Sequence, residues 1–284
     1  MPDYLTLEPA IDPNNKSTFL LDWELTMKCN LDCDYCASDL YGGHDNSTQH
    51  PVLSQCLQSI DFMFEYVDLY MQSKPNRLKY VVLNVYGGEA LHHPHIVEIL
   101  QQVQHRYKNY QSRWHLTVTT TTNAVISQNK LNQIIPLIDE FTVSYHTNNT
   151  DKQKQQFQQN LLTIKQANKR LKCIVMMHNE PTLFLDAQNM IAWLDLNNIK
   201  MLPKQLDAPK NHRLYSSQQV QWFENIYSRK SHGEDVEIKT TDTMHDMADT
   251  GRACCGGRQL CSDQNYRRRK FFVDNKFTDW YCSV

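Results

Sequence analysis

Apolar and polar positions follow two alternating periods through residues 19–230. Short apolar runs rich in branched and aromatic residues predict strands, at 19–27, 80–86, 114–121, 141–145, 173–177 and 199–202. Apolar residues at helical spacing predict helices between and after these strands, at 53–71, 96–107, 130–138, 152–168, 187–196 and 217–227. This alternation predicts parallel βαβ units whose strands are buried on both faces. We therefore expect an α/β fold, a partial (β/α)6 TIM-like barrel with reactive groups at the carboxyl ends of its strands.

The βα alternation stops at about residue 231, and a cysteine-containing stretch follows at 254–261. Two short apolar runs after it read as a hairpin, at 271–273 and 277–281. We expect three parts, namely an N-terminal extension (1–18), the barrel (19–230) and a small cysteine-rich C-terminal extension (231–284). The chain ends two residues after Cys282, which is unusual for a metal ligand and would fit a truncated sequence.

Charge and hydropathy exclude two classes of partner. A formal net charge of −2 provides no general attraction to phosphates, so we expect no nucleic-acid partner. No apolar stretch reaches the ~18–20 residues that cross a bilayer, so we expect no membrane span. The first five residues lack the basic start and apolar core of a secretory signal. We therefore expect a cytoplasmic protein.

Nine cysteines in a chain without an export signal indicate metal or redox chemistry, because cytosolic thiols are kept reduced. Cys56 and Cys173 stand alone among apolar residues and are interpreted as buried hydrophobes. The other seven form two groups, Cys29, Cys33 and Cys36, and Cys254, Cys255, Cys261 and Cys282. Three thiolates on one short loop can bind zinc, copper(I) or an iron–sulfur cluster. Zinc stays an alternative, with His44 as its fourth ligand.

Residues 29–36, CNLDCDYC, resemble the CxxxCxxC signature of the radical S-adenosylmethionine (SAM) superfamily, and the resemblance extends over residues 19–230. It implies that the three cysteines bind three irons of a [4Fe-4S] cluster, whose fourth iron binds the amino and carboxylate groups of SAM. The reduced cluster then donates an electron to SAM, and the 5′-deoxyadenosyl radical that results abstracts a hydrogen from the substrate. The resemblance also implies a reducing partner such as flavodoxin or ferredoxin.

Further matches to the superfamily follow in order along the chain. Gly87, Gly88 and Glu89 resemble its GGE motif, in which backbone groups and the carboxylate meet the SAM ammonium, although Ala90 replaces the usual proline. Two more SAM contacts, Thr122 and Asn123, are implied by likeness to the TNG element. The resemblance adds Ser144 on the fourth strand and Tyr35 near the adenine. Each of these four residues could instead be an ordinary strand-end or core residue.

Three further polar side chains fall near the ends of strands four, five and six, where a substrate would lie opposite SAM. His146, His178 and Lys204 are therefore candidates for substrate contacts or proton transfer. The plainer interpretation of each is a structural histidine or a solvated lysine.

The C-terminal cysteines resemble the auxiliary-cluster tails called SPASM and twitch domains. Gly256 to Cys261 gives the GX4C part of their pattern, although the remaining spacing departs from it. We expect a second iron–sulfur cluster there, with zinc or plain buried thiols as alternatives. The sequence thus predicts a radical SAM enzyme of the oxidoreductase or maturase type, acting on a peptide or a small molecule. The competing hypothesis is a non-catalytic metal-binding protein, either zinc-stapled or electron-transferring.

Overall fold

The computed structural model describes residues 17–33, 35–36, 49–73, 78–206, 215–230, 266–273 and 276–283. Its strands are β1 (Ser17–Thr26), β2 (Leu78–Gly87), β3 (His115–Thr122), β4 (Glu140–Tyr145), β5 (Arg170–Met177), β6 (Lys200–Gln205), β7 (Tyr266–Val273) and β8 (Lys276–Ser283). Its helices are α2 (Leu53–Ser73), α3 (Ile96–Tyr107), α4 (Gln128–Ile134), α5 (Asp151–Gln166), α6 (Pro181–Leu196) and α7 (Ser217–Lys230). Short 3-10 turns, η2 (Ala90–His92) and η3 (Ile135–Leu137), follow β2 and α4.

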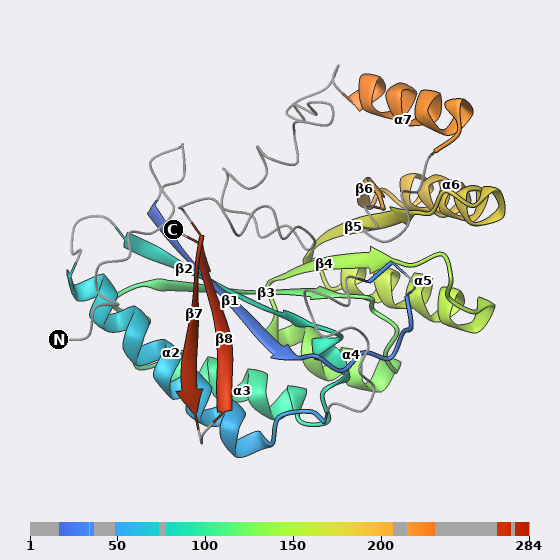
Figure 1. Ribbon diagram of the computed structural model, residues 1–284. Coiled ribbons are helices and arrows are strands. Elements are labelled where there is room, and N and C mark those ends of the chain that lie inside the picture. The colour runs from blue at the N-terminus through green and yellow to red at the C-terminus, as the bar shows by residue number, and fades with distance from the viewer. Residues whose placement is uncertain are drawn as a thin grey trace.

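The strands form one sheet in the order β6-β5-β4-β3-β2-β1-β8-β7, in which β1 to β6 pair in parallel (Figure 1). This is the partial TIM-like α/β fold that the sequence predicted. The strand order has two ends, so the sheet stays open. Because β1 to β6 run in the same direction, the loops that follow them meet at one edge of the sheet.

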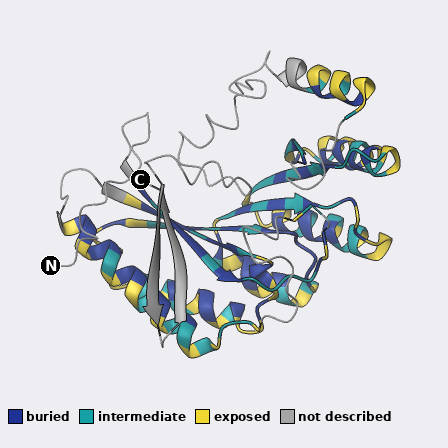
Figure 2. Ribbon diagram, viewed as in Figure 1, coloured by how far each residue is buried: buried dark blue, intermediate teal, exposed yellow. Residues whose placement is uncertain are grey.

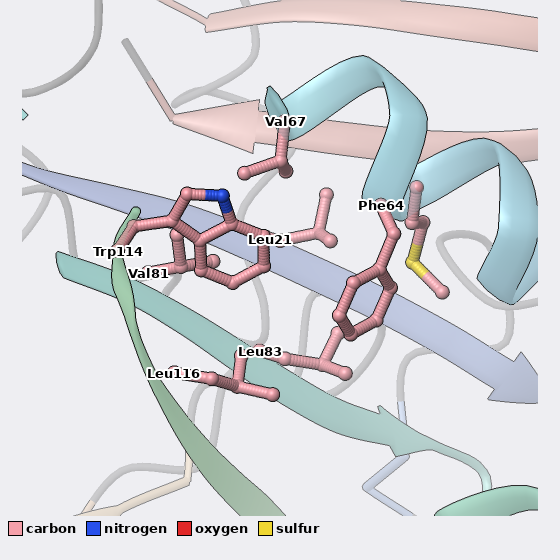
Figure 3. Close-up of a pocket in the computed structure, with 8 residues that line it drawn as sticks. Leu21, Phe64, Val67, Val81, Leu83, Trp114 and Leu116 are labelled. Atoms are coloured by element: carbon pink, nitrogen blue, oxygen red, sulfur yellow. The ribbon is translucent and has the colours of Figure 1, made fainter. Parts of the chain in front are cut away.

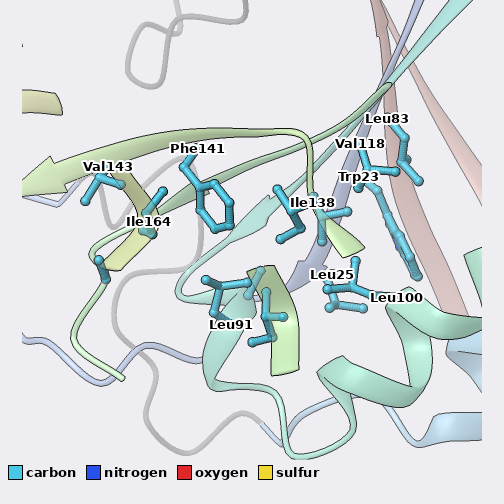
Figure 4. Close-up of a cluster of buried hydrophobic side chains, with 14 of the residues drawn as sticks. Trp23, Leu25, Leu83, Leu91, Leu100, Val118, Ile138, Phe141, Val143 and Ile164 are labelled. Carbon is cyan, nitrogen blue, oxygen red and sulfur yellow. The ribbon is translucent and has the colours of Figure 1, made fainter. Parts of the chain in front are cut away.

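The outer face of the sheet forms the core with the helices. Buried residues gather where helices meet strands, and exposed residues lie on the far sides of the helices (Figure 2). Trp23 and Leu25 of β1 pack there with Leu83 of β2 and Leu100 of α3 (Figure 4). None of the described helices has the length and apolarity needed to cross a bilayer.

The sequence pattern predicted strands buried on both faces, but the inner face of the sheet is only partly buried. In β3, β4 and β5 fully buried residues alternate with half-buried ones. Asp22, Asn84 and Thr119 lie side by side in the register of β1, β2 and β3 and form a polar row across this face. The helices of this chain pack against the other face of the sheet, and this leaves the inner face polar and partly accessible (Figure 1).

The helix ends follow local capping chemistry. Thr150 and Gln153 form a reciprocal capping box at the start of α5. Helix α6 begins at Pro181, earlier than the predicted 187, because the Glu180 side chain accepts from the Leu183 amide at 2.9 Å and proline suits the first helical turn.

The predicted hairpin is present as β7 and β8, and it extends the same sheet. β8 pairs antiparallel with β1, so that Cys282 lies opposite Leu21 in the register. Cys254, Cys255 and Cys261 fall outside the described residues, as does the zinc candidate His44.

A small hollow lies between α2 and the sheet (Figure 3), and it is apolar. Its lining side chains are Leu21, Met63, Phe64, Val67, Val81, Leu83, Trp114 and Leu116. The buried Nε1 of Trp114 has no hydrogen-bond partner among the described residues. A ligand site needs a few convergent polar groups besides an apolar wall, so this hollow is a gap in the core. Cys56 and Cys173 are buried core residues, as predicted.

Candidate functional site

The cysteine loop begins three residues after β1 ends, at the edge of the sheet where the parallel strands finish. Cys29 is half-buried, Cys33 is buried and Cys36 is exposed, and all three are free thiols. The Cys36 amide donates to the Cys33 carbonyl at 3.0 Å, which closes a tight turn between them. The loop therefore presents three thiols at different depths.

The three thiols are close enough to affect one another's ionisation. Burial raises the pKa of Cys29 to about 11 and that of Cys33 to about 12, and the neighbouring cysteines add to both shifts. With these raised pKa values the Cys29 and Cys33 thiols hold their protons at physiological pH, and binding a metal would release them. Among the described residues no three His, Cys, Asp or Glu side chains are arranged as a ligand set. The donor chemistry, three soft sulfurs on one loop, fits an iron–sulfur cluster.

Gly87, the last residue of β2, and Gly88 pack against the chain that leads into this loop. A Cβ on Gly87, whose φ is +139°, would lie 2.1 Å from the Thr26 carbonyl oxygen, and one on Gly88 would lie 2.4 Å from that of Met27. The Gly88 amide donates to the Thr26 carbonyl at 2.7 Å, and the Glu89 amide donates to the Lys28 carbonyl at 2.9 Å. Close approach to β1 thus requires both glycines, independently of any ligand.

Glu89 is buried, with 1% of its surface exposed, and its carboxylate is engaged within the chain. One oxygen accepts from the Thr122 hydroxyl at 2.7 Å and the Leu91 amide at 3.1 Å, and the other accepts from the Asn123 amide at 2.6 Å. Burial raises the pKa of Glu89, and these hydrogen bonds oppose that rise. Both Glu89 and Thr122, expected at SAM, therefore join the end of β2 to the end of β3.

Asn123 extends this connection to the cysteine loop. Its side-chain amide donates to the Asn30 oxygen at 2.8 Å and approaches the Cys29 sulfur at 4.0 Å. Asn30 in turn donates to the Val125 carbonyl at 3.1 Å. Ala124, where the superfamily pattern has glycine, keeps a left-handed φ of 53°. No sequence pattern pointed to Asn30, because its partners lie more than ninety residues further along the chain.

Three of the predicted residues meet beside Cys33. The Tyr35 hydroxyl lies 2.6 Å from His146 Nδ1, and the two rings are stacked, with centroids 5.8 Å apart. The same nitrogen lies 3.4 Å from the Cys33 sulfur. The His178 ring meets Tyr35 edge-on at 6.4 Å, and its Nδ1 accepts from the Glu180 amide at 3.0 Å.

Asn148 also contacts Cys33 and was not anticipated from the sequence. Its Oδ1 lies 3.8 Å from the Cys33 sulfur, and its amide nitrogen donates to the Asp32 carbonyl at 3.3 Å. Ser144 and Lys204 are half-buried on β4 and β6, where they pair in register with Ile174 and Met176 of the intervening β5.

No family model matches the sequence, and no curated protein matches it. Solved structures do match this chain in fold. Native anSMEcpe with bound AdoMet (SAM) matches with a TM-score of 0.54 and 11% identity, over 84% of this chain and 68% of that one. Native anSMEcpe with bound AdoMet and Kp18Cys peptide matches with a TM-score of 0.54 and 11% identity, over 81% and 65%. The chain thus spans about two thirds of the length of these proteins and shares the fold of an AdoMet-binding protein.

Proposed function

We propose that this chain is a radical SAM enzyme that abstracts a hydrogen atom from a peptide or small-molecule substrate. The observation that carries the proposal is the loop with Cys29, Cys33 and Cys36 at the end of β1, joined by hydrogen bonds to the ends of β2 and β3. A carrier or zinc-stapled protein would need the thiols, but it would not need them on the fold of an AdoMet-binding protein.

In this proposal Cys29, Cys33 and Cys36 hold a [4Fe-4S] cluster. The bound cluster and SAM supply the reductive cleavage that gives a 5′-deoxyadenosyl radical, with an electron from a flavodoxin or ferredoxin. Gly87, Gly88, Glu89, Thr122 and Asn123 shape the loops around SAM and keep the cysteine loop in position.

The inner face of the sheet and the loops at its edge would receive SAM and substrate. Ser144 and the backbone next to Tyr35 contact SAM in this proposal, while His178 and Lys204 contact the substrate or transfer protons. The peptide in one of the anSMEcpe structures favours a peptide substrate.

The C-terminal extension (231–284) is proposed to bind a second iron–sulfur cluster through the four cysteines expected from the sequence, Cys254, Cys255, Cys261 and Cys282. We place the protein in the cytoplasm, where thiols stay reduced and available to metals.

The test is anaerobic reconstitution with iron and sulfide, reduction by dithionite, and detection of methionine and 5′-deoxyadenosine from SAM by mass spectrometry. We expect cleavage by the wild type, none by Cys33→Ala, and wild-type cleavage by the control Cys173→Ala, whose thiol lies in the core. An iron content of about four per chain marks one cluster and about eight marks two. Zinc binding without iron, or cleavage that survives Cys33→Ala, would refute the proposal.

A further inference from the structure

Cys33 is the most deeply buried of the three cysteines of the loop, and three polar side chains approach its sulfur. It is 4% exposed, and His146 Nδ1 lies 3.4 Å from its Sγ. Tyr35 hydrogen-bonds to Cys33, and Asn148 approaches it at 3.8 Å. Three side chains therefore approach the sulfur, His146 and Asn148 from the segment after β4 and Tyr35 from the loop itself.

A metal-bound cysteine is a thiolate, which only accepts hydrogen bonds. Asn148 presents its oxygen to the sulfur and cannot donate to a thiolate in that orientation. His146 can donate, because one tautomer of the neutral imidazole carries its proton on Nδ1. With its proton on Nδ1, the imidazole donates to both the Cys33 sulfur at 3.4 Å and the Tyr35 hydroxyl oxygen at 2.6 Å, and the hydroxyl proton is then available for the hydrogen bond from Tyr35 to Cys33. The stacked Tyr35 ring keeps the imidazole in this position.

We propose that His146 is a positioning residue that donates its Nδ1 proton to the Cys33 thiolate and so raises the reduction potential of the [4Fe-4S] cluster. The inference rests on the proposed function and changes the role expected for His146, which was contact with the substrate or proton transfer. A donor to a ligand sulfur stabilises the more negative, reduced cluster more than the oxidised one. Burial strengthens this effect, because little water competes for the sulfur.

His178 does not share this role. Its Nδ1 already accepts from the Glu180 amide, and its ring meets Tyr35 edge-on. Cys29 has other donors, since the Leu31 amide lies 3.4 Å and the Asn123 side-chain amide 4.0 Å from its sulfur. A side-chain substitution can therefore test the hydrogen bond at Cys33 without removing those at Cys29.

The experiment is a potentiometric titration of the reconstituted full chain without SAM, followed by electron paramagnetic resonance. The signal that added SAM perturbs identifies the cluster at Cys33 and separates it from the second proposed cluster. In His146→Phe we expect the ratio of reduced to oxidised cluster at a fixed potential to fall roughly 3- to 10-fold, a midpoint lower by about 30–60 mV. His146→Asn keeps an N–H near the Nδ1 position and should recover most of the wild-type midpoint. His115→Phe, at the exposed start of β3, is the matched control and should leave it unchanged.

An iron-loaded His146→Phe variant with the wild-type midpoint would overturn the inference, as would an equal shift in His115→Phe. A shift in Tyr35→Phe with none in His146→Phe would assign the donor to the hydroxyl and reject the imidazole. Failure of both His146 variants to bind iron would show a role in assembly, which also rejects tuning. If the wild type bound no iron, the proposed function itself would fail, and that result is distinct from all the others.

Discussion

Asp22 is the buried carboxylate whose effect on stability can be worked out most directly. It lies on the inner face of β1 with 2% of its surface exposed. The Asn84 side chain donates to it at 2.8 Å and accepts from the Thr119 hydroxyl at 3.2 Å. Burial raises the pKa of Asp22 from 3.8 to about 6, and the hydrogen bond from Asn84 offsets only part of that rise.

A pKa that is raised in the folded state means that ionisation of Asp22 opposes folding. The folded chain holds the proton more tightly, so stability falls as the pH rises from about 4 to about 6. A shift of about two units corresponds to about 3 kcal/mol once the group is fully ionised. About 1 kcal/mol of this is already lost at about pH 4.5, and about 2 kcal/mol more is lost by about pH 7.5.

Asp22→Asn removes the charge and keeps an oxygen that accepts from Asn84. We therefore expect its free energy of unfolding, relative to wild type, to improve by about 2 kcal/mol between about pH 4.5 and about pH 7.5. Urea unfolding followed by circular dichroism under reducing conditions measures this at both pH values. Asp195→Asn, on the exposed side of α6, is the control and should show no such change. An equal effect of Asp22→Asn at both pH values would refute the buried-charge argument.

Two further predictions concern the loop after β2. Glu89→Gln should lower the free energy of unfolding by about 1–3 kcal/mol. The carboxylate accepts from three donors, and the NH2 group of glutamine would face one of them and could not accept from it. Urea unfolding measures this effect, and full wild-type stability would contradict it. Gly88→Ala should cost about 1–3 kcal/mol and reduce iron loading, because its Cβ would meet the Met27 and Lys28 carbonyls at 2.4 and 2.6 Å. Unfolding and iron analysis would measure both, and an unchanged variant would disprove the tight contact.

The order and type of the elements in the barrel could be predicted because each one carries its own local signal. Apolar runs such as 173–177 mark strands, and spaced apolar residues such as those of α2 mark helices. The polarity of the inner face was missed because half-buried threonines and lysines do not reveal which face they occupy until the neighbouring strands are known. The pairing of β8 with β1 has no local signal at all, since it joins the two ends of the chain.

Some features of the candidate site likewise have a local sequence pattern, and others do not. The spacing of Cys29, Cys33 and Cys36 and the position of the GGE motif are local patterns, and the sequence identified both. The partners of Asn30 and Asn148 could not be identified, because the hydrogen bond from Asn123 to Asn30 spans 93 positions and the contact between Cys33 and Asn148 spans 115. Such contacts depend on which strand ends meet, and the tertiary fold alone decides that.

The three cysteines are held to different degrees, and this bears on how a metal site would form. The Asn123 side chain contacts Cys29, and the Asn123 amide donates to Glu89, so Cys29 is connected to the ends of β2 and β3. Cys33 is contacted by His146, which follows β4. Cys36 is exposed, so its side chain has the most room to move. The described residues do not already present the three sulfurs as a ligand set, so binding one cluster would require this loop to rearrange around Cys29 and Cys33.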